Sequence, residues 1–220
     1  DTKEKIAVLN SGFAVHILRG TMDGRYFYSV GRDGKITMID TYTEVPTVVA
    51  EVKGGFDARS VEVSKFKGYE DKYLVFGGYS PSHIAIFDAQ TLEPISVTPT
   101  SGPACDGAKE FIDEARVAAI VASHTDPVWI CNVKETGMVW VVDYTDPKKP
   151  ATTQIPTARF LHDGGFDATG LGRFTMCFSN DLALRRKAAV WLFVGLKADL
   201  GKTLETSQTQ EDYLILLQPD

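Results

Sequence analysis

One layout of short strands returns three times along this chain, and this repeat restricts the possible folds more than any other feature. The third strand of each unit ends in an aspartate, in the segments Thr37–Asp40, Ala85–Asp88 and Trp140–Asp143. A repeat of about 50 residues that contains four short strands is typical of β-propeller blades. A β-sandwich built from unrelated meanders is the alternative fold.

The first unit illustrates how the strands are recognised. Apolar and polar residues alternate in Ala14–Leu18, Tyr26–Val30 and Lys35–Ile39, and the dipeptides Asp23-Gly24 and Asp33-Gly34 separate these runs. An Asp-Gly pair between alternating runs indicates a hairpin, because a tight hairpin turn needs positive φ angles at its centre. A fourth strand is expected at Thr47–Val52. The same reading predicts strands at Arg59–Ser64, Tyr73–Tyr79, His83–Phe87, Ile95–Thr98, Val117–Ser123, Val128–Val133, Met138–Val142 and Thr152–Ile155.

A fourth unit opens at Phe160–Gly165 and continues with a strand at Arg173–Ser179, after which the pattern ends. The apolar run Ala188–Val194 is compatible with a strand or a helix. We therefore expect an all-β chain with an incomplete β-propeller of about three and a half to four blades. It would occupy residues 1–180 and leave an unmatched tail at 181–220. Because an open stack of blades exposes strand edges, the ring is either small or part of a longer protein.

Several charged and titratable residues are expected to have structural roles. The repeated aspartates Asp40, Asp88 and Asp143 are expected to cap turns through their own side chains. His124 and His162 are expected to form hydrogen bonds at turns between strands. Cys105, Cys131 and Cys177 form no CxxC motif, which excludes a zinc site or a c-type haem attachment built on such a motif and indicates buried or half-buried thiols.

The composition excludes two classes of partner. The net charge of −6 argues against nucleic acid, which requires a basic surface to replace phosphate counterions. No apolar run approaches the roughly 18 residues of a membrane-spanning helix, so membrane insertion is not expected. A hydrophobic content of 44% is enough to form a core.

Several long motifs in the chain resemble those of the d1-haem domain of cytochrome cd1 nitrite reductases, which is an eight-bladed propeller. They are AVHILR (14–19), GRDGKITMID (31–40), DARSVEVSKFKGYEDKY (57–73), IFDAQTLEP (86–94), EARVAAIVASH (114–124), NVKETG (132–137), VDYTD (142–146) and RFLHDGG (159–165). The resemblance implies a periplasmic protein of denitrification that binds haem d1 and reduces nitrite to nitric oxide. It also implies a c-type haem in another part of the protein, a c-type cytochrome or cupredoxin as electron donor, and a homodimer.

The resemblance assigns roles to individual residues. His16 in AVHILR matches the proximal axial ligand of the d1 iron, and neutral imidazole is a suitable ligand for haem iron. The other matching positions are Arg19, Arg32 and Arg59 around the macrocycle carboxylates, Tyr79 near the haem, and Ala118 and Ala119 close to the macrocycle plane. Guanidinium groups can bind carboxylates bidentately, and small residues let a flat ring approach the backbone. Arg116 belongs to the same motif as the two alanines.

The first strand of each propeller blade lines the central channel. His16, Arg59 and Ala118 fall on the first strands of successive units and are therefore expected to converge.

The chain also departs from the family pattern. The family uses two distal histidines, and by motif none of His83, His124 and His162 matches them, so no catalytic residue is assigned. Besides a reductase fragment, the sequence is compatible with a non-catalytic d1-haem binding or maturation protein. A scaffold propeller without haem is the third hypothesis, which the His16 and arginine set disfavours.

Overall fold

Most strands of this protein pair with their neighbours in sequence, because short turns connect them. The computed structural model describes residues 5–107, 109–166, 173–178, 189–193, 205–209 and 212–216. The expected glycine turns form, and Gly24 and Gly34 have φ angles of 75° and 67°. The first sheet has the order β1-β2-β3-β4, with β1 (Ile17–Gly20), β2 (Tyr26–Val30), β3 (Lys35–Asp40) and β4 (Thr47–Lys53).

The second and third sheets repeat this meander. The second contains β5 (Asp57–Val63), β6 (Tyr73–Ser80), β7 (His83–Asp88) and β8 (Pro94–Pro99) in sequence order. The third contains β11 (Val117–Ala122), β12 (Val128–Val133), β13 (Met138–Asp143) and β14 (Ala151–Pro156). A small hairpin of β9 (Gly102–Pro103) and β10 (Phe111–Ile112) lies between these two sheets in sequence.

The fourth sheet begins like the others and then changes. Its order is β15-β16-β17-β19-β18, and β17 pairs with β19 in parallel. The strands are β15 (Leu161–Phe166), β16 (Arg173–Phe178), β17 (Ala189–Phe193), β18 (Glu205–Thr209) and β19 (Asp212–Leu216). The apolar run that was compatible with strand or helix is therefore a strand. The division of the chain at residue 180 stays a prediction.

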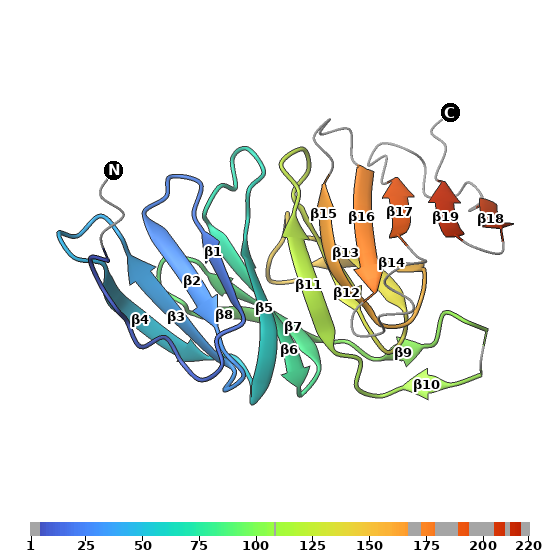
Figure 1. The fold of residues 1–220 in the computed structure, drawn as a ribbon, viewed down its shortest axis with the longest axis horizontal. Helices are drawn as coiled ribbons and strands as arrows, with labels where there is room; N and C mark the ends of the chain where they lie inside the picture. The colour runs from blue at the N-terminus through green and yellow to red at the C-terminus, as the bar shows by residue number, and fades with distance from the viewer. Residues whose placement is uncertain are drawn as a thin grey trace.

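The sheets are arranged like propeller blades around their first strands. Strand β5 packs beside β1 on one side and β11 on the other, and β11 packs beside β15. The remaining strands of each sheet fan outward from this centre (Figure 1). The all-β fold and the convergence of the first strands are confirmed. No helix occurs among the described residues, so none there could span a membrane.

Neighbouring blades pack against each other through two apolar cores. One lies between the first and second sheets around Tyr28 and Phe76, and the other lies between the second and third around Trp129 and Trp140. Buried polar groups cross these interfaces: the Tyr28 hydroxyl donates to the Ala89 carbonyl over 2.6 Å, and the Trp129 Nε1–H donates to the Val63 carbonyl over 3.2 Å. Each core thus combines apolar burial with hydrogen bonds between neighbouring sheets.

The repeated aspartates cap turns as expected. Asp40, Asp88 and Asp143 each accept a hydrogen bond from the backbone N–H two residues further on, over 2.8 to 2.9 Å. Cys131 is buried and Cys105 half-buried, as expected for such thiols. The side chain of Cys177 lies outside the described residues.

The first strand begins later than its alternating pattern predicts. Strand β1 begins at Ile17, because Ala14 has a φ angle of 46° and interrupts the extended backbone. His16 therefore precedes β1 instead of lying within it. Its N–H still donates to the Val30 carbonyl over 2.9 Å, so the ladder extends to His16.

Candidate functional site

The innermost strands of three sheets are irregular at the positions that the sequence singles out. The pairing of β5 with β6 shifts on both sides of Ala58, so that Arg59 has no paired partner. The pairing of β11 with β12 skips Ala118 and Ala119, and that of β15 with β16 skips His162. A β-bulge leaves its extra residue out of the ladder and redirects the side chain, which is common beside functional sites.

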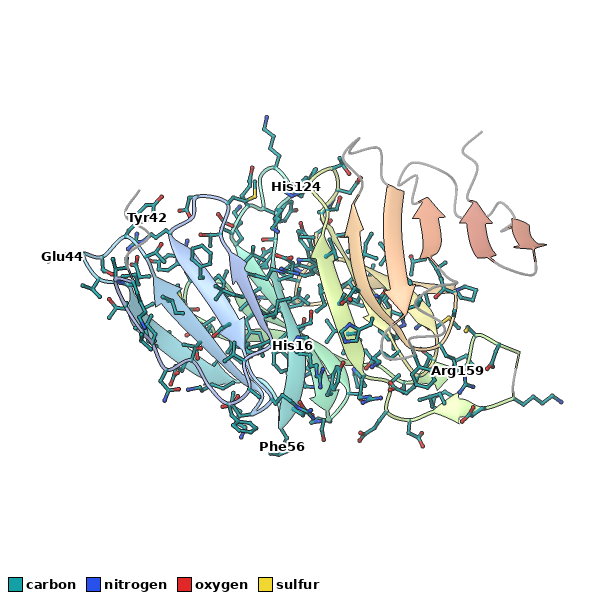
Figure 2. The ribbon with its side chains drawn as sticks, viewed as in Figure 1. His16, Tyr42, Glu44, Phe56, His124 and Arg159 are labelled. Atoms are coloured by element: carbon teal, nitrogen blue, oxygen red, sulfur yellow. The ribbon has the colours of Figure 1, made fainter. Side chains whose placement is uncertain are left out.

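His16 lies at the centre of the molecule, where the first and second sheets meet. Figure 2 shows it beside β1 and β5, far from His124 at the upper edge. Its Nε2 is 3.5 Å from the Arg59 guanidinium, and its ring centroid is 6.2 Å from that of His162. Partial burial lowers the pKa of His16 below its usual 6.5, and the charge of Arg59 acts in the same direction. The surroundings thus favour neutral imidazole, the form that binds a metal.

Three cations surround the ring of Tyr79 at the end of β6. The guanidinium carbons of Arg59 and Arg116 lie 5.6 and 5.2 Å from the ring centroid, and the Lys134 ammonium lies 5.7 Å from it. Tyr79 itself is only 6% exposed. Its hydroxyl and the Arg59 Nε are buried without a hydrogen-bond partner in the described structure. We call Arg59, Tyr79, Arg116 and Lys134 the Tyr79 cluster.

One carboxylate belongs to the edge of this cluster. Glu135 accepts hydrogen bonds from the backbone N–H and the Nε of Arg116, both over 2.6 Å. Its Oε1 also lies 2.5 Å from the Arg116 guanidinium. Arg116 is therefore neutralised locally, whereas Arg59 and Lys134 have no carboxylate within ion-pair distance in the part of the chain that the structure describes.

Two predicted site arginines are engaged by carboxylates of β5. The Nε of Arg19 lies 3.0 Å from the buried Glu62, and Arg32 binds Asp57 through two nitrogens over 2.6 and 3.3 Å. Both arginines thus approach the second sheet but do not join the Tyr79 cluster. A guanidinium has five N–H donors, so each arginine could still bind a second anion.

The two predicted alanines lie in the bulge of β11, beside β5. Ala118 is 3% exposed and Ala119 is half-buried. The N–H of the next residue, Ile120, donates to the Ser60 hydroxyl over 3.1 Å, which ties β11 to the strand that carries Arg59. The backbone of the bulge is therefore held close to the Tyr79 cluster.

His16 and His162 lie close together, which no motif in the sequence predicts. The Nδ1 of His162 lies 2.7 Å from the Asp163 carboxylate, and the Asn132 side-chain amide donates to the Asp163 carbonyl over 3.2 Å. An imidazole held by a carboxylate can store and transfer a proton at its other nitrogen. The signal in the sequence was the position of His162 on the first strand of the fourth unit, because the topology brings these first strands to the centre of the molecule.

The other two histidines lie apart from this arrangement. His83 is buried against Phe76, and its Nδ1 lies 2.7 Å from the Pro81 carbonyl, so it stabilises a turn. His124 is exposed. Lys134 and Glu135 were not predicted as site residues, although both lie in the segment NVKETG. Charged residues next to a turn are usually solvated, so the burial of Lys134 against Tyr79 of β6 has no local signal in the sequence.

The fold and the site define a propeller-type β domain with a cationic cluster and a histidine close to its innermost strands. Solved propellers share the fold. The periplasmic gluconolactonase PpgL of Pseudomonas aeruginosa aligns with a TM-score of 0.62 at 15% identity, over 93% of this chain and 63% of that one. The model of the cytochrome D1 heme domain family matches residues 1–209. The chain therefore belongs to the cytochrome D1 heme domain family.

Proteins that are similar to most of this chain confirm its resemblance to nitrite reductases with a d1-haem domain. A nitrite reductase of Stutzerimonas stutzeri is 56% identical over 203 residues, which cover 92% of this chain and 35% of that protein. A dihydro-heme d1 dehydrogenase of Pseudomonas aeruginosa is 29% identical, over 76% of this chain and 31% of that protein. The solved structure of dihydro-heme d1 dehydrogenase NirN in complex with DHE aligns with a TM-score of 0.68 at 25% identity, over 88% of this chain and 38% of that one. The chain spans about a third of the length of these curated relatives.

Proposed function

We propose that this chain is the haem d1-binding part of a nitric oxide-forming nitrite reductase of denitrification. The observation that carries the proposal is the match of 56% identity to a nitrite reductase over 92% of the chain. The site supports it, since an imidazole whose surroundings favour the neutral form adjoins a partly buried cationic cluster with unpaired polar atoms. Periplasmic location, a c-type haem elsewhere in the whole protein, an external c-type cytochrome or cupredoxin as donor, and a homodimer are part of the same proposal.

The residues present fit a macrocycle with acidic substituents. Arg59 Nε and Tyr79 Oη are buried donors that lack a partner in the described structure, and an anionic ligand would satisfy them. His16 would bind the iron, Arg19, Arg32 and Arg59 would bind the carboxylates, and Ala118 and Ala119 would leave room for the macrocycle. When bound, haem iron supplies one-electron redox chemistry. The protein residues would bind, orient and shield it.

His162 is the group we propose for proton transfer. Asp163 binds its Nδ1 over 2.7 Å, which leaves Nε2 as the nitrogen that can give or accept a proton. Its ring lies beside His16 and not at the surface, with only 16% of the side chain exposed. Nitrite reduction to nitric oxide releases one oxygen as water, so a proton donor at this place suits the reaction.

Titration with haem d1, followed by visible absorption, tests the proposed function. We expect saturable binding to the unmodified chain and loss of the histidine-ligated spectrum in His16→Ala. His124→Ala is the matched control, because this exposed histidine lies far from the site (Figure 2). An unchanged spectrum in His16→Ala would refute the ligand assignment, and absence of binding to the unmodified chain would refute the function.

A non-catalytic haem d1-binding or maturation protein is the second candidate. The likeness to dihydro-heme d1 dehydrogenase NirN, which is named as an enzyme but not as a nitrite reductase, supports a role other than nitrite reduction. The identity of 29% to such an enzyme, against 56% to a nitrite reductase, favours the reductase. Replacement of His162 by Gln in the whole protein separates the two, because it should abolish nitrite turnover but leave haem binding intact in a reductase.

A further inference from the structure

The Tyr79 cluster carries more positive charge than its own carboxylate balances. Arg59, Arg116 and Lys134 approach the ring from three elements, and Glu135 binds only Arg116. In the part of the chain that the structure describes, no other carboxylate reaches ion-pair distance of Arg59 or Lys134. Two cations thus face one aromatic ring without a carboxylate at ion-pair distance among the described residues.

Lys134 is the most unusual of these cations. It is only 6% exposed, whereas the side chain of Arg116 is 43% exposed. Burial lowers the pKa of Lys134, and the charges of Arg116 and Arg59 lower it further, while Glu135 opposes them. A buried charge without an ion-pair partner reduces stability, and an anionic ligand at this place would compensate it.

The backbone contacts of Lys134 do not depend on its side chain. Its N–H donates to the Arg116 carbonyl over 2.9 Å, and its carbonyl accepts a hydrogen bond from the Phe160 N–H over 2.7 Å. These bonds hold the end of β12 beside the residues that precede β11 and β15, and they form with any non-proline residue at this position. The ammonium group is therefore not needed for these backbone contacts.

We propose that Lys134 binds a carboxylate substituent of the macrocycle, together with Arg59, and thereby selects tetrapyrroles with an acidic group at the Tyr79 edge of the site. The inference rests on the proposed function, that a tetrapyrrole binds here. The aromatic ring of Tyr79 supplies a flat apolar wall, and its unpaired hydroxyl supplies a further donor to the same acid. An ammonium group presents three donors and adapts to a carboxylate in several orientations.

Binding of metal-free coproporphyrin, a tetracarboxylate, measures this contact without iron ligation. We expect Lys134→Met to weaken binding about 10- to 100-fold, the usual range for loss of a charge-assisted hydrogen bond. Lys134→Arg should retain most of the affinity, since it keeps the charge. Lys67→Met is the matched control, because Lys67 is exposed in the turn before β6, at the opposite end of that strand from Tyr79. Fluorescence titration gives the dissociation constants.

Stability measurements distinguish a ligand contact from a structural role. Because Lys134→Met removes an uncompensated buried charge, its free energy of unfolding should equal or exceed that of the unmodified chain. An affinity within twofold of the unmodified chain would overturn the inference. A loss of affinity that accompanies a matching loss of stability would also overturn the inference. If the unmodified chain binds haem d1 but not coproporphyrin, or binds coproporphyrin independently of Lys134, only this inference is refuted. If the chain binds neither tetrapyrrole, the proposed function itself fails.

Discussion

Replacement of Glu62 by Gln should destabilise the fold far more than a change in one surface charge. Glu62 is 2% exposed on β5. Its two carboxylate oxygens lie 3.0 Å from Arg19 Nε and 3.1 Å from Lys65 Nζ. The contact with Arg19 ties the first blade to the second. Glutamine keeps the shape of the side chain and removes only its charge, so the substitution isolates the electrostatic contribution.

The expected loss follows from the burial of the three groups. Removal of one partner from a buried ion pair costs about 3–5 kcal/mol, which sets the upper limit here. The side chains of Arg19 and Lys65 are 36% and 22% exposed, so water partly compensates them. We therefore expect a loss of about 2–3 kcal/mol, or a fall in Tm of about 4–12 °C.

Urea denaturation followed by circular dichroism measures this loss. Glu51→Gln is the matched control, because Glu51 forms an exposed ion pair with Lys35 over 2.6 Å. Such pairs contribute less than about 1 kcal/mol. A double-mutant cycle with Arg19→Met should give a coupling energy above about 1 kcal/mol between Arg19 and Glu62. If Glu62→Gln costs no more than Glu51→Gln, the burial argument is wrong.

Three further results are expected. Because the folded-state pKa of His16 is lowered from 6.5, the unfolded chain takes up its proton first as the pH falls, so His16 reduces stability below about pH 6.5. His16→Asn should lose less stability than the unmodified chain between pH 7.5 and 5.5, and equal losses in urea titrations would contradict this assignment. Trp129→Ala should cost about 3–5 kcal/mol, since the indole is fully buried and binds the Val63 carbonyl. A loss below about 1 kcal/mol in the same assay would show that this interface contributes little. Burial also raises the pKa of the Cys131 thiol, so peptide mapping after alkylation at pH 8 should find Cys131 unmodified in the folded chain, and rapid labelling would disprove its burial.

The blades could be predicted from the sequence because their signals are local. Alternating runs, Asp-Gly turns and the repeated terminal aspartates each act within a few residues, and the structure confirms the strands that they predict. The start of β1 could not be predicted in this way, since the conformation of Ala14 interrupts a run that alternates correctly. Periodicity reports which residues face the core, but it does not report where the backbone leaves the ladder.

Only part of the candidate site could be predicted from local patterns in the sequence. Motifs identified His16, Arg59 and Tyr79, and the structure brings these three together. The bulges that present Arg59 and His162 have no pattern of their own in the sequence. The burial of Lys134 and the pairing of Arg19 with Glu62 depend on contacts between different blades, which no local pattern encodes. Long-range packing therefore decides which charges are compensated.

The bulges of the inner strands keep several candidate site residues out of the pairing that holds each sheet. Arg59, Ala118 and His162 occupy positions that the ladders skip, so none has a cross-strand partner. A substitution at such a position exchanges a side chain of the site but breaks no pair that sets the register of a sheet. Members of the family could therefore acquire different ligand preferences through single substitutions while each blade keeps its pairing.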